Sequence, residues 1–339
     1  MPLIPSTTSI GGKPRVILGL MTFGPPGSES KGARITSLDD YNKNLDYFQK
    51  QGYNELDTAR TYISGDQEAF TREARWKDRG FALATKCYPV QPGDHSPEKL
   101  RASLEKSLKE LGTDSVDIFY LHAPDRSVPF DVTLKAADEL FKEGKFSQLG
   151  LSNYAAWEVA EIWNIANERG LVKPTIYQAM YNAITREIET ELVPALRKYK
   201  MDLVVYNPLA GGMFSGKYKS KQEIPDTGRF ASVNPNVGKM YRERYFKDVY
   251  FSALQLIEPV VTKHNLTLIE TALRWLRHHS LLKSTDGSND GIIIGVSSLS
   301  QLETNLEVIE KGPLPEEVVA VLDEAWNTLF KAQAPSYWR

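Results

Sequence analysis

The chain has 339 residues, of which 41% are hydrophobic and 25% are charged, a composition typical of a globular enzyme with a large core. Its net charge of −2 gives no support to nucleic acid or an anionic membrane as a partner. The single cysteine, Cys87, excludes an intrachain disulfide and favours a reducing compartment. The N-terminal residues lack the pattern of a signal peptide and no apolar run is long enough to span a membrane, so a cytoplasmic location is expected.

Eight short segments rich in β-branched and aromatic residues recur along the chain, and each is predicted to form a β-strand. Several of them are almost continuously apolar, as parallel strands covered on both faces are. In chain order, the predicted strands span residues 15–24, 54–59, 81–88, 115–123, 147–153, 175–183, 202–210 and 291–298.

Amphipathic helical segments lie between most of these strands. The clearest spans residues 96–112, where Ser96 is expected to cap the start, Pro97 to occupy the first turn and Gly112 to end the helix. Its leucines recur every three or four residues and therefore share one face. Pro194 is expected to kink a further helix or to mark its start. Similar helical patterns span residues 131–144, 154–170, 267–280 and 299–312.

The alternation of strands and helices predicts a (β/α)8 TIM barrel, with residues 1–339 forming a single domain. A doubly wound open sheet is the alternative. It requires a Gly-x-Gly-x-x-Gly turn, and the segment GLMTFGPPGS after the first strand lacks that spacing. Residues 210–248 follow the seventh strand, and their length and Gly, Pro and aromatic content predict an ordered functional loop with room for a short helix.

Four polar residues lie at or just beyond the carboxyl ends of predicted strands, where barrels of this kind place their active sites. Asp57, Lys86 and His122 follow the second, third and fourth strands, and Tyr62 lies in the loop after the second. Each alone could be a cap, a surface residue or a core residue, but their joint placement indicates a site. The lysine cation, held by the carboxylate, is expected to lower the phenol pKa from its usual value of about 10. Such a phenol could protonate a carbonyl oxygen during hydride transfer, although no side chain can supply the hydride.

The motifs that contain these residues, DTARTY, ATKC and YLHAPD, resemble the aldo-keto reductase superfamily. YNPLAGGMFSGKY, GRF at 228–230, MYRERY and SYWR are similar to its branch of aflatoxin-aldehyde and succinic-semialdehyde reductases. The resemblance covers nearly the whole chain. It implies a metal-free reductase in which Tyr62 donates the proton, Asp57 and Lys86 tune the phenol, and His122 helps to place the carbonyl.

The resemblance also implies NADPH bound in an extended form across the top of the barrel. Ser152, Asn153 and Gln178 would hold the nicotinamide carboxamide, and Tyr206 would stack on the ring. Gln301 stands where many members have an arginine for the 2′-phosphate, but the related branch shares this pattern, so NADPH remains the expected cofactor. The pyrophosphate would be lined by Asn207, Pro208, Leu209, Ala210, Gly211, Gly212, Lys217 and Arg229, and the adenosine end by Ser297, Ser298, Gln301 and Asn305.

The glycine-rich segment after the seventh strand has a second interpretation. Gly211, Gly216 and Lys217 fit the spacing of a P-loop. The next residue is Tyr218, where that motif requires a Ser or Thr hydroxyl for magnesium. The sequence therefore argues against nucleotide hydrolysis.

In the resembled branch, the positions of Tyr241, Arg244 and Arg339 contact anionic substrate groups, and a guanidinium fork suits a carboxylate. Met21 and Trp338 are expected to form apolar walls. The predicted activity is NADPH-dependent reduction of aldehydes to alcohols, with dialdehydes, carboxylate-bearing aldehydes and aryl aldehydes as substrates. A reductase dedicated to one biosynthetic step and a cofactor-sensing regulatory subunit of the same fold are the alternatives. The resemblance suggests a homodimer.

Overall fold

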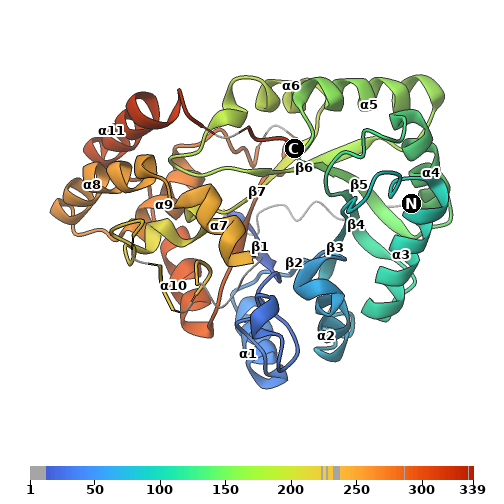
Figure 1. Ribbon diagram of the computed structural model, residues 1–339, viewed down its shortest axis with the longest axis horizontal. Helices are drawn as coiled ribbons and strands as arrows, with labels where there is room; N and C mark the ends of the chain where they lie inside the picture. The colour runs from blue at the N-terminus through green and yellow to red at the C-terminus, as the bar shows by residue number, and fades with distance from the viewer. Residues whose placement is uncertain (1–12, 223, 227, 232–236, 286, 335) are drawn as a thin grey trace.

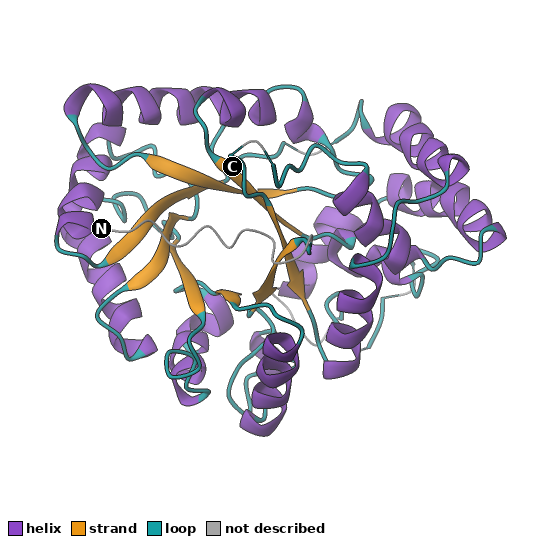
Figure 2. Ribbon diagram, turned by 180° about the vertical axis from the view of Figure 1, so that it is seen from behind, coloured by secondary structure: helices purple, strands orange, loops and turns teal. Residues whose placement is uncertain are grey.

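The computed structural model describes residues 13–222, 224–226, 228–231, 237–285, 287–334 and 336–339. Within them, eight parallel strands pair in chain order and β8 pairs with β1, which closes a barrel (Figures 1 and 2). The predicted (β/α)8 fold is confirmed. Residues 1–12, where no signal peptide is expected, lie outside the described residues. The strands are β1 (Arg15–Gly19), β2 (Glu55–Asp57), β3 (Ala82–Cys87), β4 (Val116–Leu121), β5 (Phe146–Ser152), β6 (Pro174–Met180), β7 (Asp202–Tyr206) and β8 (Gly291–Gly295).

Helices surround the barrel (Figure 2). Pro97 opens α3 and Gly112 ends it with a φ of 69°, as predicted, but the Ser96 side chain makes no capping hydrogen bond. The helix predicted around Pro194 begins two residues before it, at Leu192. The helices are α1 (Leu38–Lys50), α2 (Gln67–Glu73), α3 (Pro97–Leu111), α4 (Phe130–Lys142), α5 (Ala156–Arg169), α6 (Leu192–Lys198), α7 (Val237–Tyr245), α8 (Asp248–Lys263), α9 (Leu268–His278), α10 (Leu299–Ile309) and α11 (Glu316–Ala325).

The strands end earlier than the predicted segments, and β1 and β7 differ most. Residues 20–24 and 207–210 leave the sheet after β1 and β7 and enter loops. Leu20, Phe23 and Ala210 are nevertheless fully buried, so their apolar character reflects packing beneath the loops rather than strand pairing. The long segment after β7 contains the helix α7, as predicted, and this helix lies beside the mouth of the barrel in Figure 1.

The barrel interior forms the floor of the cavity described below. Tyr120 on β4 fills this interior, and a Cβ at Gly150 on β5 would lie only 2.3 Å from its ring, so the two strands need this large and small pair. The ring centroid lies 6.0 Å from the Lys86 ammonium. Cys87 points to the other side of β3, where burial raises the pKa of its thiol to about 11, so the thiol is protonated at neutral pH. No helix in the described part of the chain is long and apolar enough to cross a membrane.

Candidate active site

A cavity of about 1100 Å³ opens at the carboxyl ends of the strands. Asp57, Tyr62 and His122 line it, and Lys86 lies directly beneath them with no exposed surface. Their positions follow from the barrel, because β2, β3 and β4 are neighbours and their ends converge on one rim. The structure thus brings together the four residues that the sequence singled out.

A buried ion pair lies at the base of this group. The Lys86 ammonium donates to Asp57 Oδ1 at 2.6 Å and to the Thr58 carbonyl oxygen at 2.6 Å. Its third contact is the Tyr62 hydroxyl at 3.3 Å. The other carboxylate oxygen of Asp57 accepts a hydrogen bond from Gln178 Nε2 at 2.8 Å. Both charges are therefore satisfied inside the protein, which is the condition for a stable buried pair.

The pKa of the Tyr62 phenol departs from the prediction. Burial, followed by the negative charge of Asp57, raises it well above the ordinary value. The expectation that Lys86 would lower it is wrong for this structure, because burial and the carboxylate outweigh the cation. Burial likewise lowers the pKa of Lys86, and the nearby Asp57 opposes that effect. Tyr62 is therefore protonated at neutral pH.

His122 stands beside this phenol, with its ring centroid 6.3 Å from that of Tyr62 and nearly perpendicular to it. Tyr88 flanks the other side at 5.5 Å. Burial, then the charges of Lys86 and Arg339, lowers the pKa of His122 well below its usual value, so its imidazole is neutral. Its Nδ1 is buried and has no hydrogen-bond partner among the described residues. A neutral imidazole beside a protonated phenol at the cavity suits an uncharged polar ligand atom near both rings.

Several loops around the cavity hold residues with positive φ. Ile63 and Ser64, directly after Tyr62, have φ angles of 49° and 54°. A β-branched residue rarely adopts this conformation, so the turn is strained and must be held by its surroundings. Asn153 and Asn207, at 62° and 57°, have the residue type that tolerates it best among those with a side chain.

Most of the residues assigned to the cofactor by resemblance line the cavity. Ser152, Ala210 and Ser298 do not: Ser152 and Ala210 are buried, and Ser298 accepts a hydrogen bond from the Gln301 backbone at the start of α10. Asn153 joins several elements, since it donates to the His122 carbonyl oxygen at 2.7 Å and accepts from Tyr206 at 3.4 Å. The lining members are Asn153, Gln178, Tyr206, Asn207, Pro208, Leu209, Gly211, Gly212, Lys217, Arg229, Ser297, Gln301 and Asn305.

The cavity is strongly positive. Asp57 is its one acidic lining residue among those described, and it is already paired with Lys86. The lining also requires glycine at position 211, since its φ is 68° and a Cβ there would lie 2.7 Å from the Tyr245 ring. A long anionic ligand such as a nicotinamide dinucleotide fits this donor set. The cationic lining residues are Lys31, Arg34, Lys217, Lys219, Arg229, Arg244 and Arg339.

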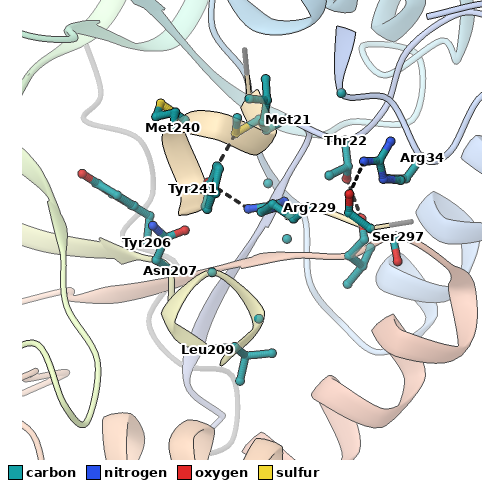
Figure 3. A pocket seen from close by; sticks show the side chains of 18 of the residues that line it. Met21, Thr22, Arg34, Tyr206, Asn207, Leu209, Arg229, Met240, Tyr241 and Ser297 are labelled. Atoms are coloured by element: carbon teal, nitrogen blue, oxygen red, sulfur yellow. Dashed lines mark hydrogen bonds between the residues drawn. The ribbon is translucent and has the colours of Figure 1, made fainter. Parts of the chain in front are cut away.

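The residues assigned to the substrate are only partly brought together. Met21, Tyr241, Arg244 and Arg339 line the cavity, and Figure 3 shows Tyr241 between Met21 and Arg229. The Tyr241 hydroxyl accepts from Arg229 at 2.9 Å, which connects the two assigned subsites. Arg339 is held at the mouth because its backbone N–H donates to the Asn153 carbonyl oxygen at 3.0 Å.

Trp338 is a correction to the sequence analysis. It does not line the cavity, because its ring is 43% exposed and packs against the Arg126 guanidinium at 5.5 Å. Neighbouring residues of an extended segment point to opposite sides, so Arg339 at the mouth directs Trp338 away from it.

Sequence reasoning also missed lining residues. Tyr88 directly follows β3, and this position at a strand end was a usable signal. Arg34 comes from the loop after β1, and Met240 comes from α7. Neither has a local sequence signal, since only the folded chain brings Arg34 to the β8 end and Met240 to the barrel mouth (Figure 3).

This fold and site define a class of protein: a TIM-barrel reductase with an Asp–Tyr–Lys–His group. The Aldo/keto reductase family model matches residues 15–327, and the chain belongs to that family. It is an NAD(P)-dependent oxidoreductase, and its family and relatives support carbonyl reduction as its general chemistry.

Named relatives cover most of the chain. An aldo-keto reductase of Pseudocercospora fijiensis is 44% identical over 86% of this chain and 99% of that protein. Aflatoxin B1 aldehyde reductase member 2 of Mus musculus is 41% identical over 96% of this chain and 88% of its own length. Aldo-keto reductase family 7 member A3 of Homo sapiens is 40% identical over 96% of this chain and 98% of that protein.

The buried ion pair predicts an asymmetric response to substitution. Asp57→Asn leaves Lys86 buried without a counter-charge and is expected to lower the free energy of unfolding by about 3–5 kcal/mol. Adding Lys86→Met removes the stranded charge and should recover most of the loss. Urea unfolding of both variants measures this, with Glu143→Gln on the exposed Arg101 pair as a control that should barely change the midpoint. Equal losses in the single and double variants would contradict the pairing argument.

The lowered pKa of His122 predicts that its imidazole stays neutral throughout the pH range 6–8. Nitrogen-15 NMR of the histidine rings, with the His122 signals assigned by their disappearance in His122→Asn, should show that these signals do not titrate in this range. The unfolded chain binds a proton that the native chain does not, so His122 reduces the free energy of unfolding as pH falls below about 6.5. A His122 signal that titrates near pH 6.5 would show that burial does not control this group.

Proposed function

We propose that the protein reduces aldehydes to alcohols with NADPH, using Tyr62 as the proton donor. The observation that carries the proposal is the Tyr62 hydroxyl, which is protonated, lies 3.3 Å from the buried Lys86 ammonium and faces a cavity lined by cations. A donor in this position can protonate an oxygen that gains negative charge during reduction.

Each residue of the group has a distinct task in this proposal. NADPH, when bound, supplies the hydride to the carbonyl carbon. Tyr62 transfers its proton to the carbonyl oxygen, and the ammonium of Lys86 stabilises the phenolate that remains. Asp57 keeps Lys86 in place through the 2.6 Å contact. The neutral His122 lines the cavity beside Tyr62 and can donate a hydrogen bond from its protonated ring nitrogen, which orients the carbonyl oxygen.

The preference for NADPH over NADH rests on charge. Arg34, Lys217 and Arg229 line the cavity and have no ion-pair partner among the described residues. An additional phosphate group on the cofactor would therefore meet guanidinium and ammonium groups that the protein does not neutralise itself.

Carboxylate-bearing aldehydes are the proposed preferred substrates, alongside dialdehydes and aryl aldehydes. Arg244 and Arg339 both line the cavity, and the charge of Arg339 reaches His122 strongly enough to contribute to its lowered pKa. A guanidinium that lines the same cavity can bind the carboxylate of a substrate while its aldehyde group lies between His122 and Tyr62. The name of the Mus musculus relative gives an aldehyde as that protein's substrate, which agrees with this class.

Removal of the phenol tests the proton donor. Tyr62→Phe keeps the ring but removes the hydroxyl, and kcat for succinic semialdehyde is expected to fall by about 10²- to 10⁴-fold. Tryptophan fluorescence quenching should give an unchanged Kd for NADPH, since the phenol does not bind the phosphates. A variant with wild-type kcat would assign proton donation to another group.

Removal of the terminal guanidinium tests substrate recognition. Arg339→Gln is expected to raise KM for succinic semialdehyde by about 10- to 100-fold, the loss of one charge-assisted contact, and to change KM for 4-nitrobenzaldehyde little. Arg101→Gln is the charge-matched control, because Arg101 is paired with the exposed Glu143 and does not line the cavity. Equal effects on both aldehydes would exclude anion recognition by Arg339.

A further inference from the structure

The loop between β1 and α1 brings a cation to the β8 side of the cavity. The Arg34 backbone N–H donates to the Thr22 carbonyl oxygen at 2.7 Å, and the Thr22 hydroxyl donates to the carbonyl oxygen of Val296. These two contacts place Arg34 beside the residues that follow β8, and Figure 3 shows Arg34, Thr22 and Ser297 together. Arg34 lies far from this segment in the sequence. Its own loop contains no sequence pattern that predicts a cofactor site.

The Arg34 side chain reaches the rim of the same cavity. Its guanidinium donates to the carbonyl oxygens of Gly228 at 2.6 Å and Ala33 at 2.8 Å, and to no carboxylate among the described residues. Together with the Glu29 carbonyl oxygen at 3.4 Å, three backbone oxygens accept from the guanidinium, but no described carboxylate forms an ion pair with it.

A second guanidinium lies next to the first. Arg229 follows Gly228, and its Nη2 would lie 3.8 Å from a Cβ at Gly295, the last residue of β8. Burial and then the charge of Arg229 lower the pKa of Arg34, while the charge of Glu29 opposes the shift, so the two guanidinium groups lie close enough to repel each other. Two like charges in a partly desolvated site repel each other, and an anion between them relieves that repulsion.

Two other cations of the cavity are instead paired with carboxylates. Lys31, in the same loop as Arg34, is paired with Asp66 at 2.6 Å. Lys219, in the same segment as Arg229, is paired with Glu258 at 2.7 Å. The absence of a carboxylate therefore distinguishes Arg34 and Arg229 from cations a few residues away.

The segment that follows β8 supplies neutral groups to this end of the cavity. Ser297, Gln301 and Asn305 line the cavity, and the Gln301 side-chain oxygen accepts from the Ser297 backbone N–H at 2.9 Å. A hydroxyl and two amides can bind a ribose and a base, but they cannot balance the charge of a phosphate dianion. The compensating charge has to come from another part of the chain, and Arg34 is the cation in position to supply it.

We propose that Arg34, together with Arg229, binds the 2′-phosphate of NADPH and sets the preference for NADPH over NADH. This inference rests on the proposed function, since it assumes the dinucleotide lies with its adenosine end at β8. The planar fork of the guanidinium can bind two phosphate oxygens at once. Arg34 is a binding residue for the cofactor and has no part in proton transfer.

The test compares equilibrium binding of two cofactors that differ by one phosphate. Kd values for NADPH and NADH are measured by tryptophan fluorescence quenching for wild type, Arg34→Gln and Arg101→Gln. Arg101 is the charge-matched control, because it is paired with Glu143 on the surface and does not line the cavity. Arg34→Gln is expected to weaken NADPH binding by about 10- to 100-fold and to leave NADH binding within about twofold. Arg101→Gln should change neither.

Two further measurements separate the possible failures. The first is competition by 2′,5′-ADP, which carries the 2′-phosphate but no nicotinamide, and by 5′-AMP, which lacks both. Arg34→Gln should weaken the binding of 2′,5′-ADP only. Arg34→Lys keeps the charge without the fork and should recover part of the NADPH affinity, which excludes a general folding defect as the cause. Equal losses for NADPH and NADH, or none for either, would overturn the role of Arg34. A wild type that binds both cofactors equally would instead overturn the NADPH preference itself.

Discussion

The site depends on one buried ion pair, between Lys86 and Asp57. An ammonium with no exposed surface is costly to desolvate, and it is tolerated because Asp57 and the Thr58 carbonyl oxygen both accept from it at 2.6 Å. Closure of the barrel makes this possible, since it places the ends of β2 and β3 side by side. The same geometry leaves the third ammonium direction for the Tyr62 hydroxyl. The position of the phenol is therefore a consequence of satisfying the lysine.

The charges above this ion pair, at the β8 side of the cavity, differ from it because they have no ion-pair partner in the described part of the chain. At the base of the cavity every charge has a partner, whereas Arg34 and Arg229 at its β8 side have none among the described residues. Unpaired like charges lower the stability of a folded protein, and a ligand that neutralises them restores it through binding. The cationic lining of this cavity therefore attracts the phosphate groups of a dinucleotide, independently of any contact with its base or ribose.

The sequence predicted the barrel and the group at its base because both leave local signals. Strand composition marks eight segments, and Asp57, Lys86 and His122 stand at their ends. The pKa of Tyr62 was predicted in the wrong direction, because its largest cause is burial, which depends on the folded surroundings of the phenol and leaves no local signal in the sequence. Arg34 left no signal for the same reason, since its contacts with Thr22 and Gly228 join two loops that only the fold brings together.

The division between strand ends and loops separates chemistry from selectivity. Asp57 and Lys86 lie on strands and His122 follows one directly, so the barrel fixes their positions within narrow limits. Arg34, Arg229 and Arg339 come from loops and the carboxyl-terminal segment, where hydrogen bonds to backbone oxygens, to a tyrosine or through a backbone N–H hold them. Substitutions in these segments cost little core packing. Cofactor and substrate preference can therefore change through Arg34 and Arg339 while the proton donor and its ion pair stay the same.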